Sequence, residues 1–208
     1  MKSSLLKVCF VLAAVTLSSA TVFADNPNLL TNSGFNLGST TLITSGSNPG
    51  STAATGWNAW SDVAGTTLTS QLLASNAPGG SGNMLYVSTS NYSSGIYQMY
   101  PFVPAENGVT ASLWINVLSG NVGMAIVGGS VHYVWATTGT GWQQLNYSGT
   151  GPVNEIAIYN WSSGGASFYV ENASVVDPPP SVPEPASLLL LGTGLSAFLL
   201  KSRERNTK

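Results

Sequence analysis

The sequence contains very few cations, and those it has lie at its two ends. Only six of the 208 residues are Lys or Arg, and none of them falls between Asp25 and Pro180. Six acidic residues remain in that stretch, which therefore carries a formal charge of −6. A surface without cations cannot neutralise phosphate groups, so nucleic-acid binding is excluded. The same absence excludes a lysine Schiff base, a P-loop lysine and an arginine clamp.

Cysteine and histidine are almost absent as well. The single cysteine, Cys9, lies within residues 1–24, and the single histidine is His132. If residues 1–24 are removed, the protein has no disulfide, thiol nucleophile or cysteine metal site. His132 lies in a strand-like run with no nucleophile elbow beside it, so we interpret it as a structural residue. No nucleotide-binding loop, zinc pattern or redox motif is present.

Residues 1–24 have the pattern of a secretory signal peptide. Two lysines make a positive start, an apolar run covers 8–17, and small residues precede the end at Ala24. This pattern predicts cleavage by signal peptidase between Ala24 and Asp25. The alternative is a buried N-terminal helix. We therefore expect an exported protein.

Residues 183–208 have three parts in a fixed order. Pro183, Glu184 and Pro185 are followed by an apolar stretch, 186–200, and then by a basic tail. An apolar helix of this length spans about 22 Å, short of the ~30 Å hydrocarbon core, which suits transient membrane anchoring. The basic tail predicts that the helix end stays in the cytoplasm and that the preceding domain lies outside.

This order of motif, apolar helix and basic tail resembles the PEP-CTERM sorting signal of Gram-negative bacteria. The resemblance implies recognition by an exosortase-type membrane transpeptidase, removal of the helix and delivery to the cell surface or the exopolysaccharide matrix. A plain single-pass membrane anchor is the alternative. Residues 178–182 are rich in proline, which predicts a stiff spacer before the sorting signal.

Residues 25–177 have the pattern of one all-β domain. Apolar residues alternate with other residues in three runs, at 109–117, 155–159 and 168–171, as expected for half-buried antiparallel strands. About nine strands separated by turn residues predict an antiparallel β-sandwich of the jelly-roll type, flanked by the signal helix and the sorting helix. The other expected strands are 68–73, 83–88, 95–103, 121–127, 130–136 and 141–147.

Five segments, in order, resemble the galactose-binding-like superfamily of jelly-roll carbohydrate-binding modules. They are the opening at 28–36, the Gly-Trp pair at 56–57, the strand segments 95–98 and 141–144, and the closing segment 168–175. The resemblance implies the fold and a non-catalytic sugar-binding role. It leaves the ligand open, because most of these positions lie in the core or at strand edges.

Acidic residues in the opening and closing segments of that family often help to hold a structural calcium. Here position 36 is Asn, and the closing acid pair is Glu171 followed by Asn172. The loss of carboxylates weakens an oxygen site for a hard cation. Calcium held by Glu171 and backbone carbonyls is the alternative, which we do not favour, and we expect no cofactor.

Sugar recognition needs flat rings against the C–H faces of the sugar, and uncharged polar groups or acids for its hydroxyls. Residues 25–177 hold all six tryptophans, many amide and hydroxyl side chains and no cation, which suits a neutral polysaccharide. Trp57 and Trp142 match family positions and are expected in the core. Alternation and proximity to loops select the candidate ligand-binding residues, which are Trp60, Trp114, Asn116, Trp135, Tyr159 and Trp161.

An Asn–aromatic–Ser element occurs three times, at 91–95, 146–149 and 160–164. Ordinary turn chemistry explains this composition, because Asn, Ser and Gly all favour turns. The functional alternative is a set of loops that offer a ring and amides to a sugar. The sequence leaves both interpretations open.

Two further hypotheses stand beside glycan binding. The low charge and the sorting signal also suit a structural surface or matrix protein without a discrete ligand, and exposed rings would argue against it. A glycoside-acting enzyme is the weakest hypothesis, because it needs two carboxylates roughly 5–9 Å apart. Glu155 and Glu171, which both alternate away from the core, come nearest to such a pair. We expect no enzyme.

Overall fold

The computed structural model describes residues 27–45, 50–80 and 82–177. The predicted signal peptide, proline-rich spacer and sorting signal lie outside these residues. No helix in the described ranges is long and apolar enough to cross a membrane.

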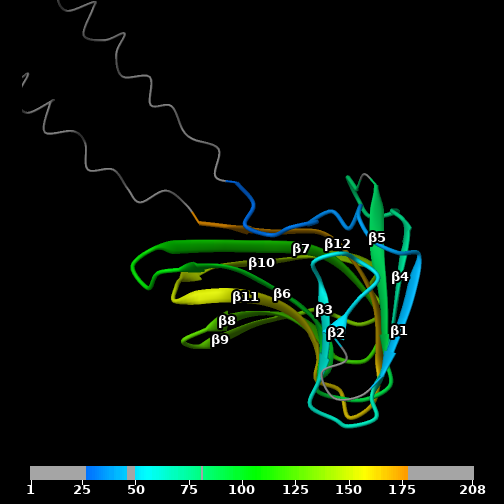
Figure 1. Ribbon diagram of the computed structural model, residues 1–208. Helices are drawn as coiled ribbons and strands as arrows, with labels where there is room; N and C mark the ends of the chain where they lie inside the picture. The colour runs from blue at the N-terminus through cyan, green and yellow to red at the C-terminus, as the bar shows by residue number, and fades with distance from the viewer. Residues whose placement is uncertain (1–26, 46–49, 81, 178–208) are drawn as a thin grey trace, which may run out of the picture.

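Two antiparallel sheets of six strands each pack face to face (Figure 1). We call sheet 1 the one with the strand order β1-β4-β5-β12-β7-β10, and sheet 2 the one with the order β2-β3-β6-β11-β8-β9. The strands of sheet 1 are β1 (Thr41–Ser45), β4 (Thr67–Ala74), β5 (Asn83–Thr89), β12 (Ala166–Val176), β7 (Gly108–Ser119) and β10 (Trp142–Thr150). Those of sheet 2 are β2 (Gly50–Ser51), β3 (Asn58–Ser61), β6 (Ser94–Val103), β11 (Val153–Asn160), β8 (Val122–Gly128) and β9 (Val131–Trp135).

The core lies between the two sheets and follows the alternation in the sequence. Along β7, Val109, Leu113, Ile115 and the other apolar partners of the run are buried, and the residues between them are partly or fully exposed. The inward face of β11 is equally well buried, and Ile158 has no exposed area. Period-two burial of this kind is what an antiparallel sandwich requires, and the predicted fold class is confirmed.

Trp57 lies in the core, as expected. It is 1% exposed and packs against Phe35, with ring centroids 5.1 Å apart. Phe35 belongs to the opening segment, so this pair ties the start of the domain to the turn before β3. A buried ring pair of this kind contributes to folding and offers no surface to a ligand.

The nine expected strands are present, and three more were not predicted. These three are β1, β2 and β3, which lie between residues 41 and 61. β2 has two residues and β3 has four, too few for an alternation to be recognised. β1 is an edge strand of sheet 1 that reads Thr-Leu-Ile-Thr-Ser, with Ile43 exposed.

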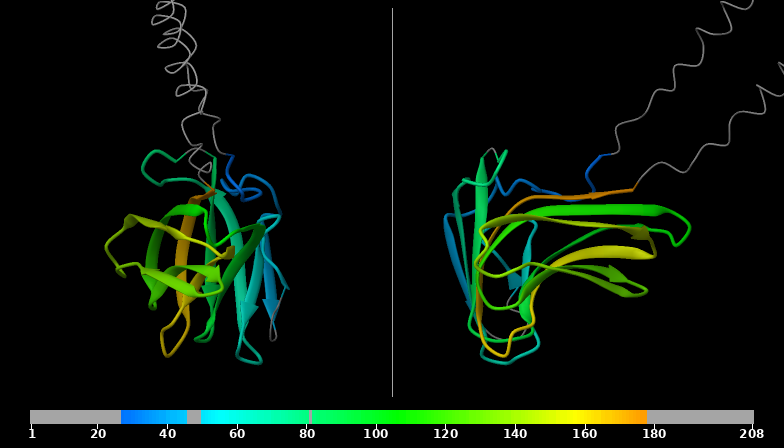
Figure 2. Two further views of the ribbon diagram at one scale, coloured as in Figure 1. Left: turned by 90° about the vertical axis from the view of Figure 1, so that its left-hand side faces the viewer. Right: turned by 180° about the vertical axis from the view of Figure 1, so that it is seen from behind.

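The long strands are bent, so that the two sheets curve together (Figures 1 and 2). The outer face of sheet 2 lies on the inside of this bend, and the outer face of sheet 1 lies on the outside. We call them the concave face and the convex face.

The first and last described segments of the domain lie side by side. The backbone N–H of Leu29 donates to the carbonyl of Val175 (2.8 Å), and Val175 N–H donates to Oδ1 of Asn28 (3.0 Å). The chain therefore enters and leaves the domain at neighbouring points, as the ribbon shows (Figure 2).

Candidate functional site

Aromatic residues and glycines alternate in one row across the concave face. In the strand register, Gly95 on β6 lies between Trp60 on β3 and Tyr159 on β11. Gly123 on β8 lies in the same way between Tyr159 and Trp135 on β9. Because the glycines have no side chains, the rings can lean across them and meet.

The rings of this row form one connected cluster with two neighbours. Tyr159 is its centre and contacts Trp60, Trp161 and Tyr133, with ring centroids 5.0, 5.1 and 6.1 Å away. Tyr133 in turn stacks on Trp135, with centroids 5.4 Å apart and planes 14° apart. We call these five residues the ring cluster.

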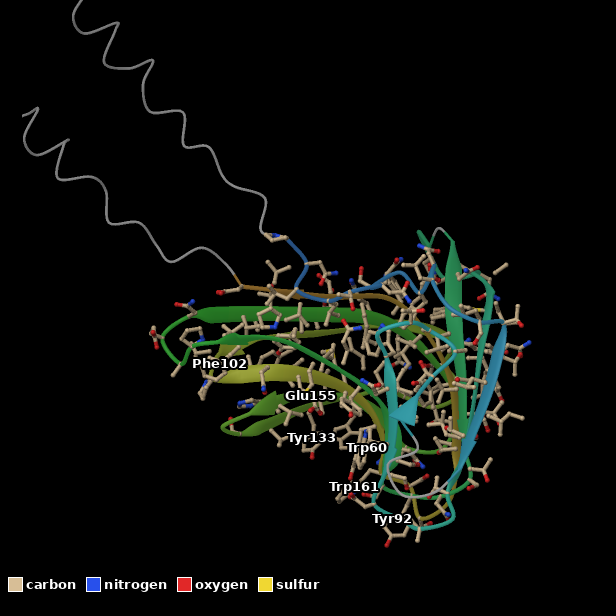
Figure 3. All side chains as sticks on the ribbon, in the orientation of Figure 1. Trp60, Tyr92, Phe102, Tyr133, Glu155 and Trp161 are labelled. Atoms are coloured by element: carbon tan, nitrogen blue, oxygen red, sulfur yellow. The ribbon has the colours of Figure 1, made fainter. Side chains whose placement is uncertain are left out.

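The inner rings of the cluster support the outer ones. Tyr159 is only 7% exposed, whereas Trp161 is 58%, Tyr133 46% and Trp135 41% exposed. Figure 3 shows Trp60, Tyr133 and Trp161 along the inside of the bend. Isolated apolar side chains are common on protein surfaces, whereas three neighbouring exposed rings form one apolar patch, which makes this surface the candidate site.

A short hydrogen-bond chain joins the base of the cluster to an acid. The hydroxyl of Ser93 donates to Oδ2 of Asp62 (2.7 Å) and lies 3.1 Å from the hydroxyl of Tyr159. Burial raises the pKa of Tyr159, and the hydrogen bond with Ser93 partly opposes this shift. At neutral pH the phenol is therefore protonated, and the chain fixes its ring.

Two of the three Asn–aromatic–Ser elements meet at one end of the concave face. The buried amide of Asn160 donates to the carbonyls of Asn91 (3.0 Å) and Gly164 (2.9 Å). The loops held in this way present Tyr92 and Trp161, which are both more than half exposed and lie near each other in Figure 3. The third element, at 146–149, lies on β10 of sheet 1.

Towards the other end, the concave face becomes apolar with one acid. Met99, Phe102 and Val131 are exposed there. Glu155 lies between Met99 and Val127 in the register, and its carboxyl group forms no hydrogen bond with any described residue. Burial raises the pKa of Glu155. Burial also raises the pKa of Tyr100, with a smaller contribution from the negative charge of Glu155.

The structure brings together four of the six predicted ligand-binding residues and separates the other two. Trp60, Trp135, Tyr159 and Trp161 all belong to the ring cluster. Trp114 and Asn116 do project away from the core, but they lie on β7 of sheet 1 and therefore on the convex face. Alternation shows which way a side chain points, but it does not show to which sheet the strand belongs.

Trp142 was expected in the core, and this expectation is wrong. It is only partly buried, and its indole N–H donates to Oδ1 of Asn76 (2.9 Å). Trp142 pairs with Asn116 in the register, so it too lies on the convex face. Its match to a family position therefore did not indicate burial.

Sequence reasoning missed Tyr133 and Tyr92. The signal for Tyr133 was available, because Val131, Tyr133 and Trp135 alternate with His132 and Val134 along β9. The alternation that places Trp135 on the outer face places Tyr133 beside it. For Tyr92 the signal was the first of the three Asn–aromatic–Ser elements.

The carboxylate pair considered for an enzyme does not form. Glu155 lies on β11 of sheet 2 and Glu171 on β12 of sheet 1, so the two acids are on opposite sides of the core. Glu171 is also fully buried rather than facing solvent. His132 is exposed, lies 2.9 Å from the hydroxyl of Ser130 and packs on the ring of Tyr147. These neighbours do not make a catalytic triad.

The residues discussed for calcium lie near the loop between β4 and β5. Glu171 contributes one carboxylate, which accepts a hydrogen bond from Ser75. Oδ1 of Asn36 accepts the N–H of Asn83, and the amide nitrogen of Asn172 faces Glu171. No group of three or more His, Cys, Asp or Glu side chains that could hold a metal is found among the described residues.

Comparison with known protein families gives a match at the C-terminal end. Residues 181–205 match the PEP-CTERM protein-sorting motif. The chain carries a PEP-CTERM signal. The match includes Pro183, Glu184 and Pro185 and confirms that part of the sequence analysis. No curated protein matches this sequence.

Solved structures similar to this domain include carbohydrate-binding modules. The CBM22-1-CBM22-2 tandem domain of Xyn10C from Paenibacillus barcinonensis is 12% identical with a TM-score of 0.51, over 80% of this chain and 49% of that one. The CBM22-1 xylan-binding domain of the same Xyn10C is 12% identical with a TM-score of 0.44, over 67% and 95%. The CBM22-1-GH10 modules of Clostridium thermocellum Xyn10B are 13% identical with a TM-score of 0.44, over 62% and 27%.

This chain thus spans about half of the tandem domain and about a quarter of the Xyn10B structure. The likeness to the tandem domain shows the fold alone, a β-sandwich similar to that of the CBM22 modules. A fold by itself does not decide between binding and catalysis.

Proposed function

We propose that this is an exported, non-catalytic protein whose β domain binds a neutral polysaccharide on its concave face. The observation that carries the proposal is the ring cluster, in which Trp161, Tyr133 and Trp135 are exposed beside the half-buried ring of Trp60 and the buried ring of Tyr159. Rings at a solvent-exposed surface stack on the C–H faces of sugars and release water from both.

Polar groups around the cluster suit the hydroxyls of a sugar. The amide of Asn58, the hydroxyl of Tyr133 and the indole N–H of Trp135 form no hydrogen bond with other described residues, so they are available to a ligand. Asp62 and Glu155 can accept hydrogen bonds from sugar hydroxyls. Both acids would repel an anionic chain, and no Lys or Arg lies within 25–180 to attract one. The proposed ligand is therefore uncharged.

The sorting signal supports the place of action. Together with the predicted signal peptide, a PEP-CTERM motif at 181–205 suits a protein that is exported and processed by an exosortase-type transpeptidase. We place the domain at the cell surface or in the extracellular matrix, after transient anchoring by the C-terminal apolar segment. In that setting the ligand would be a neutral component of the exopolysaccharide.

The hypothesis of a structural matrix protein without a ligand is less well supported. It requires that the aromatic residues be buried by packing within the domain, whereas Trp161, Tyr133 and Trp135 are each more than 40% exposed. Exposure of neighbouring aromatic rings to water is energetically unfavourable. A purely structural surface gains nothing from such exposure.

The test is affinity electrophoresis of the full-length protein in native gels that contain xylan, a mixed-linkage β-glucan, galactan or dextran. We expect at least one polysaccharide to slow the protein, and Trp161→Ala to be slowed clearly less than the wild type. Leu37→Ala is the matched control, because Leu37 is similarly exposed (62%) and lies outside the ring cluster. Normal mobility of the folded protein with every polysaccharide, or equal retardation of Trp161→Ala, contradicts the proposal.

A further inference from the structure

We propose that the convex face is a second binding surface for neutral polysaccharide, so that one domain can hold two chains and bridge them. The bridging rests on the proposed function of the concave face, whereas binding at the convex face does not. Its site is a strip of six residues that no part of that function uses. We call it the convex strip, and its members are Thr41, Gln71, Tyr86, Tyr169, Asn116 and Trp142.

The register places these six residues in one row across sheet 1. Trp142 on β10 lies opposite Asn116 on β7, which lies opposite Tyr169 on β12. The row continues through Tyr86 on β5 to Gln71 on β4 and ends on β1. Six adjacent strands at the usual spacing of about 4.8 Å give a strip roughly 24 Å long. An extended oligosaccharide can lie along a surface of this length.

The middle of the convex strip is aromatic and continuous. The rings of Tyr86 and Tyr169 have centroids 5.2 Å apart, and Trp142 reaches over Asn116 to lie 6.3 Å from Tyr169. All three rings are partly exposed. The indole N–H of Trp142 donates to Asn76, which fixes that ring at one end of the strip.

Hydrogen-bonding groups of the strip are unused. The amides of Gln71 and Asn116 and the hydroxyls of Tyr86 and Tyr169 form no hydrogen bonds with other described residues. Free amides and phenols beside rings are the groups that bind sugar hydroxyls in a flat, open site. Gln144, on the same face and next to the strip along β10, is exposed and also unused.

The absence of exposed charge on the convex face favours an uncharged ligand. The outward-facing residues of sheet 1 are Thr, Ser, Asn, Gln and aromatic or aliphatic side chains, and the single acid among the described ones, Glu171, is fully buried. A face without exposed charge offers nothing to a phosphate, an acidic glycan or a basic peptide. Its rings and free amides fit the same uncharged polysaccharide chemistry as the concave face.

The two faces lie on opposite sides of the core, one on each sheet. A chain bound on one face therefore leaves the other free, and two chains can be held at once. A domain that binds one polysaccharide chain on each face cross-links the two chains, even if each contact is weak. Many such domains in a polysaccharide network act together by avidity.

The test is a sandwich capture with the full-length protein. A sensor is coated with the polysaccharide that slows the protein in the gels, the protein is bound, and a fluorescent soluble form of the same polysaccharide is added. We expect the wild type to capture the soluble chain. Tyr86→Ala with Trp142→Ala should still bind the coated sensor but capture at least tenfold less. Trp161→Ala with Trp135→Ala should show the same loss of capture. All four substitutions together should abolish binding to the sensor.

Control measurements distinguish bridging by one domain from bridging by a dimer. Thr110→Ala, which alters an exposed residue of the same face away from the strip, should leave capture unchanged. Light scattering tests for a second copy of the chain: a dimer with only concave sites would capture in spite of the convex substitutions, and this result overturns the proposal. So does a wild type that binds the sensor and captures nothing. Failure of the wild type to bind any polysaccharide overturns the proposed function as well. Circular dichroism of each variant confirms its folding.

Discussion

The ring of Trp60 on β3 stacks on the ring of Tyr159 on β11, although β6 runs between the two strands. Their centroids are 5.0 Å apart and their planes differ by 17°. The contact depends on Gly95, which occupies the intervening position on β6. Gly123 stands in the same relation to Tyr159 and Trp135 on the other side. Two glycines thus turn separate aromatic residues into one surface.

Removal of an exposed ring should weaken polysaccharide binding and leave the fold intact. Central aromatic contacts in binding sites typically contribute about 1–2 kcal/mol, so we expect Trp161→Ala or Trp135→Ala to reduce affinity roughly 5- to 30-fold. Isothermal titration calorimetry measures this change. Both residues are well exposed, so the urea midpoint of unfolding should change little. Unchanged affinity in both variants would place the ligand elsewhere.

A methyl group at Gly123 should disturb the cluster from beneath. A Cβ there would lie 2.8 Å from Cε3 of Trp135 and 2.8 Å from the carbonyl of Val134. Overpacking of this kind usually costs about 1–3 kcal/mol, and we expect Gly123→Ala to lose stability and polysaccharide affinity together. Gly164→Ala is the matched control, because a Cβ at Gly164 meets no atom within 4 Å. Urea unfolding compares the two variants, and equal stabilities would contradict this account.

Replacement of Asn160 should destabilise the fold far more than replacement of Asn146, which begins a similar Asn–aromatic–Ser element. The buried amide of Asn160 bonds the carbonyls of Asn91 and Gly164 and accepts the N–H of Ser162, whereas Asn146 is exposed on β10 and forms no such bonds. An unsatisfied buried polar group costs about 1–3 kcal/mol. We therefore expect Asn160→Ala to lower the free energy of unfolding by about 2 kcal/mol or more, and Asn146→Ala by much less. Equal losses would show that the two elements are ordinary turns of the same kind.

Glu155 should make the domain less stable as the pH rises. Burial raises the pKa of this carboxyl in the folded protein above its ordinary value of 4.5, so the folded state binds the proton more tightly than the unfolded state. The stabilisation that this group contributes is fully present below the pKa of Glu155 in the unfolded state. It is lost as the pH rises through the pKa of Glu155 in the folded state. Urea midpoints between about pH 4 and pH 7 should fall more for the wild type than for Glu155→Gln. Parallel curves for the two proteins would refute this expectation.

Salt should have little effect on binding. The proposed ligand is uncharged and the domain carries no Lys or Arg, so no ion pair forms in the complex. Between about 50 mM and about 500 mM NaCl, the dissociation constant should change less than about twofold, because only interactions between charges are screened. Affinity electrophoresis at several salt concentrations provides the measurement. A steep loss of affinity with salt would indicate a charged ligand.

The sequence predicted the strands and their inward faces well, because burial in an antiparallel sandwich follows a period of two. The inward faces of the runs that contain Val117 and Ile158 are buried for this reason. The same rule could not say which strands share a sheet. Trp114 and Trp60 both face outward but belong to different sheets, and Glu155 and Glu171 lie on opposite sides of the core. Pairing between distant strands is set by tertiary packing, which a period of two does not reveal.

The contacts between aromatic rings could not be predicted from the sequence either. Tyr159 alternates outward, which predicts exposure, yet it is 7% exposed because the rings around it cover it. Such burial depends on the glycines on the neighbouring strands, more than thirty positions away along the chain in each case. Only the register brings these residues together.

The path of the last strand has a mechanical consequence. β12 is hydrogen-bonded to β5 on one side and β7 on the other, and Leu29 adds a further bond to Val175 near its end. A force applied to the chain beyond residue 177 would act along β12. The hydrogen bonds to the neighbouring strands run perpendicular to this direction, so they would have to break together rather than one after another. The ring cluster lies on the other sheet, so tension between a held polysaccharide and the C-terminal end would pass through the whole core. The domain is thus arranged to resist and transmit tension.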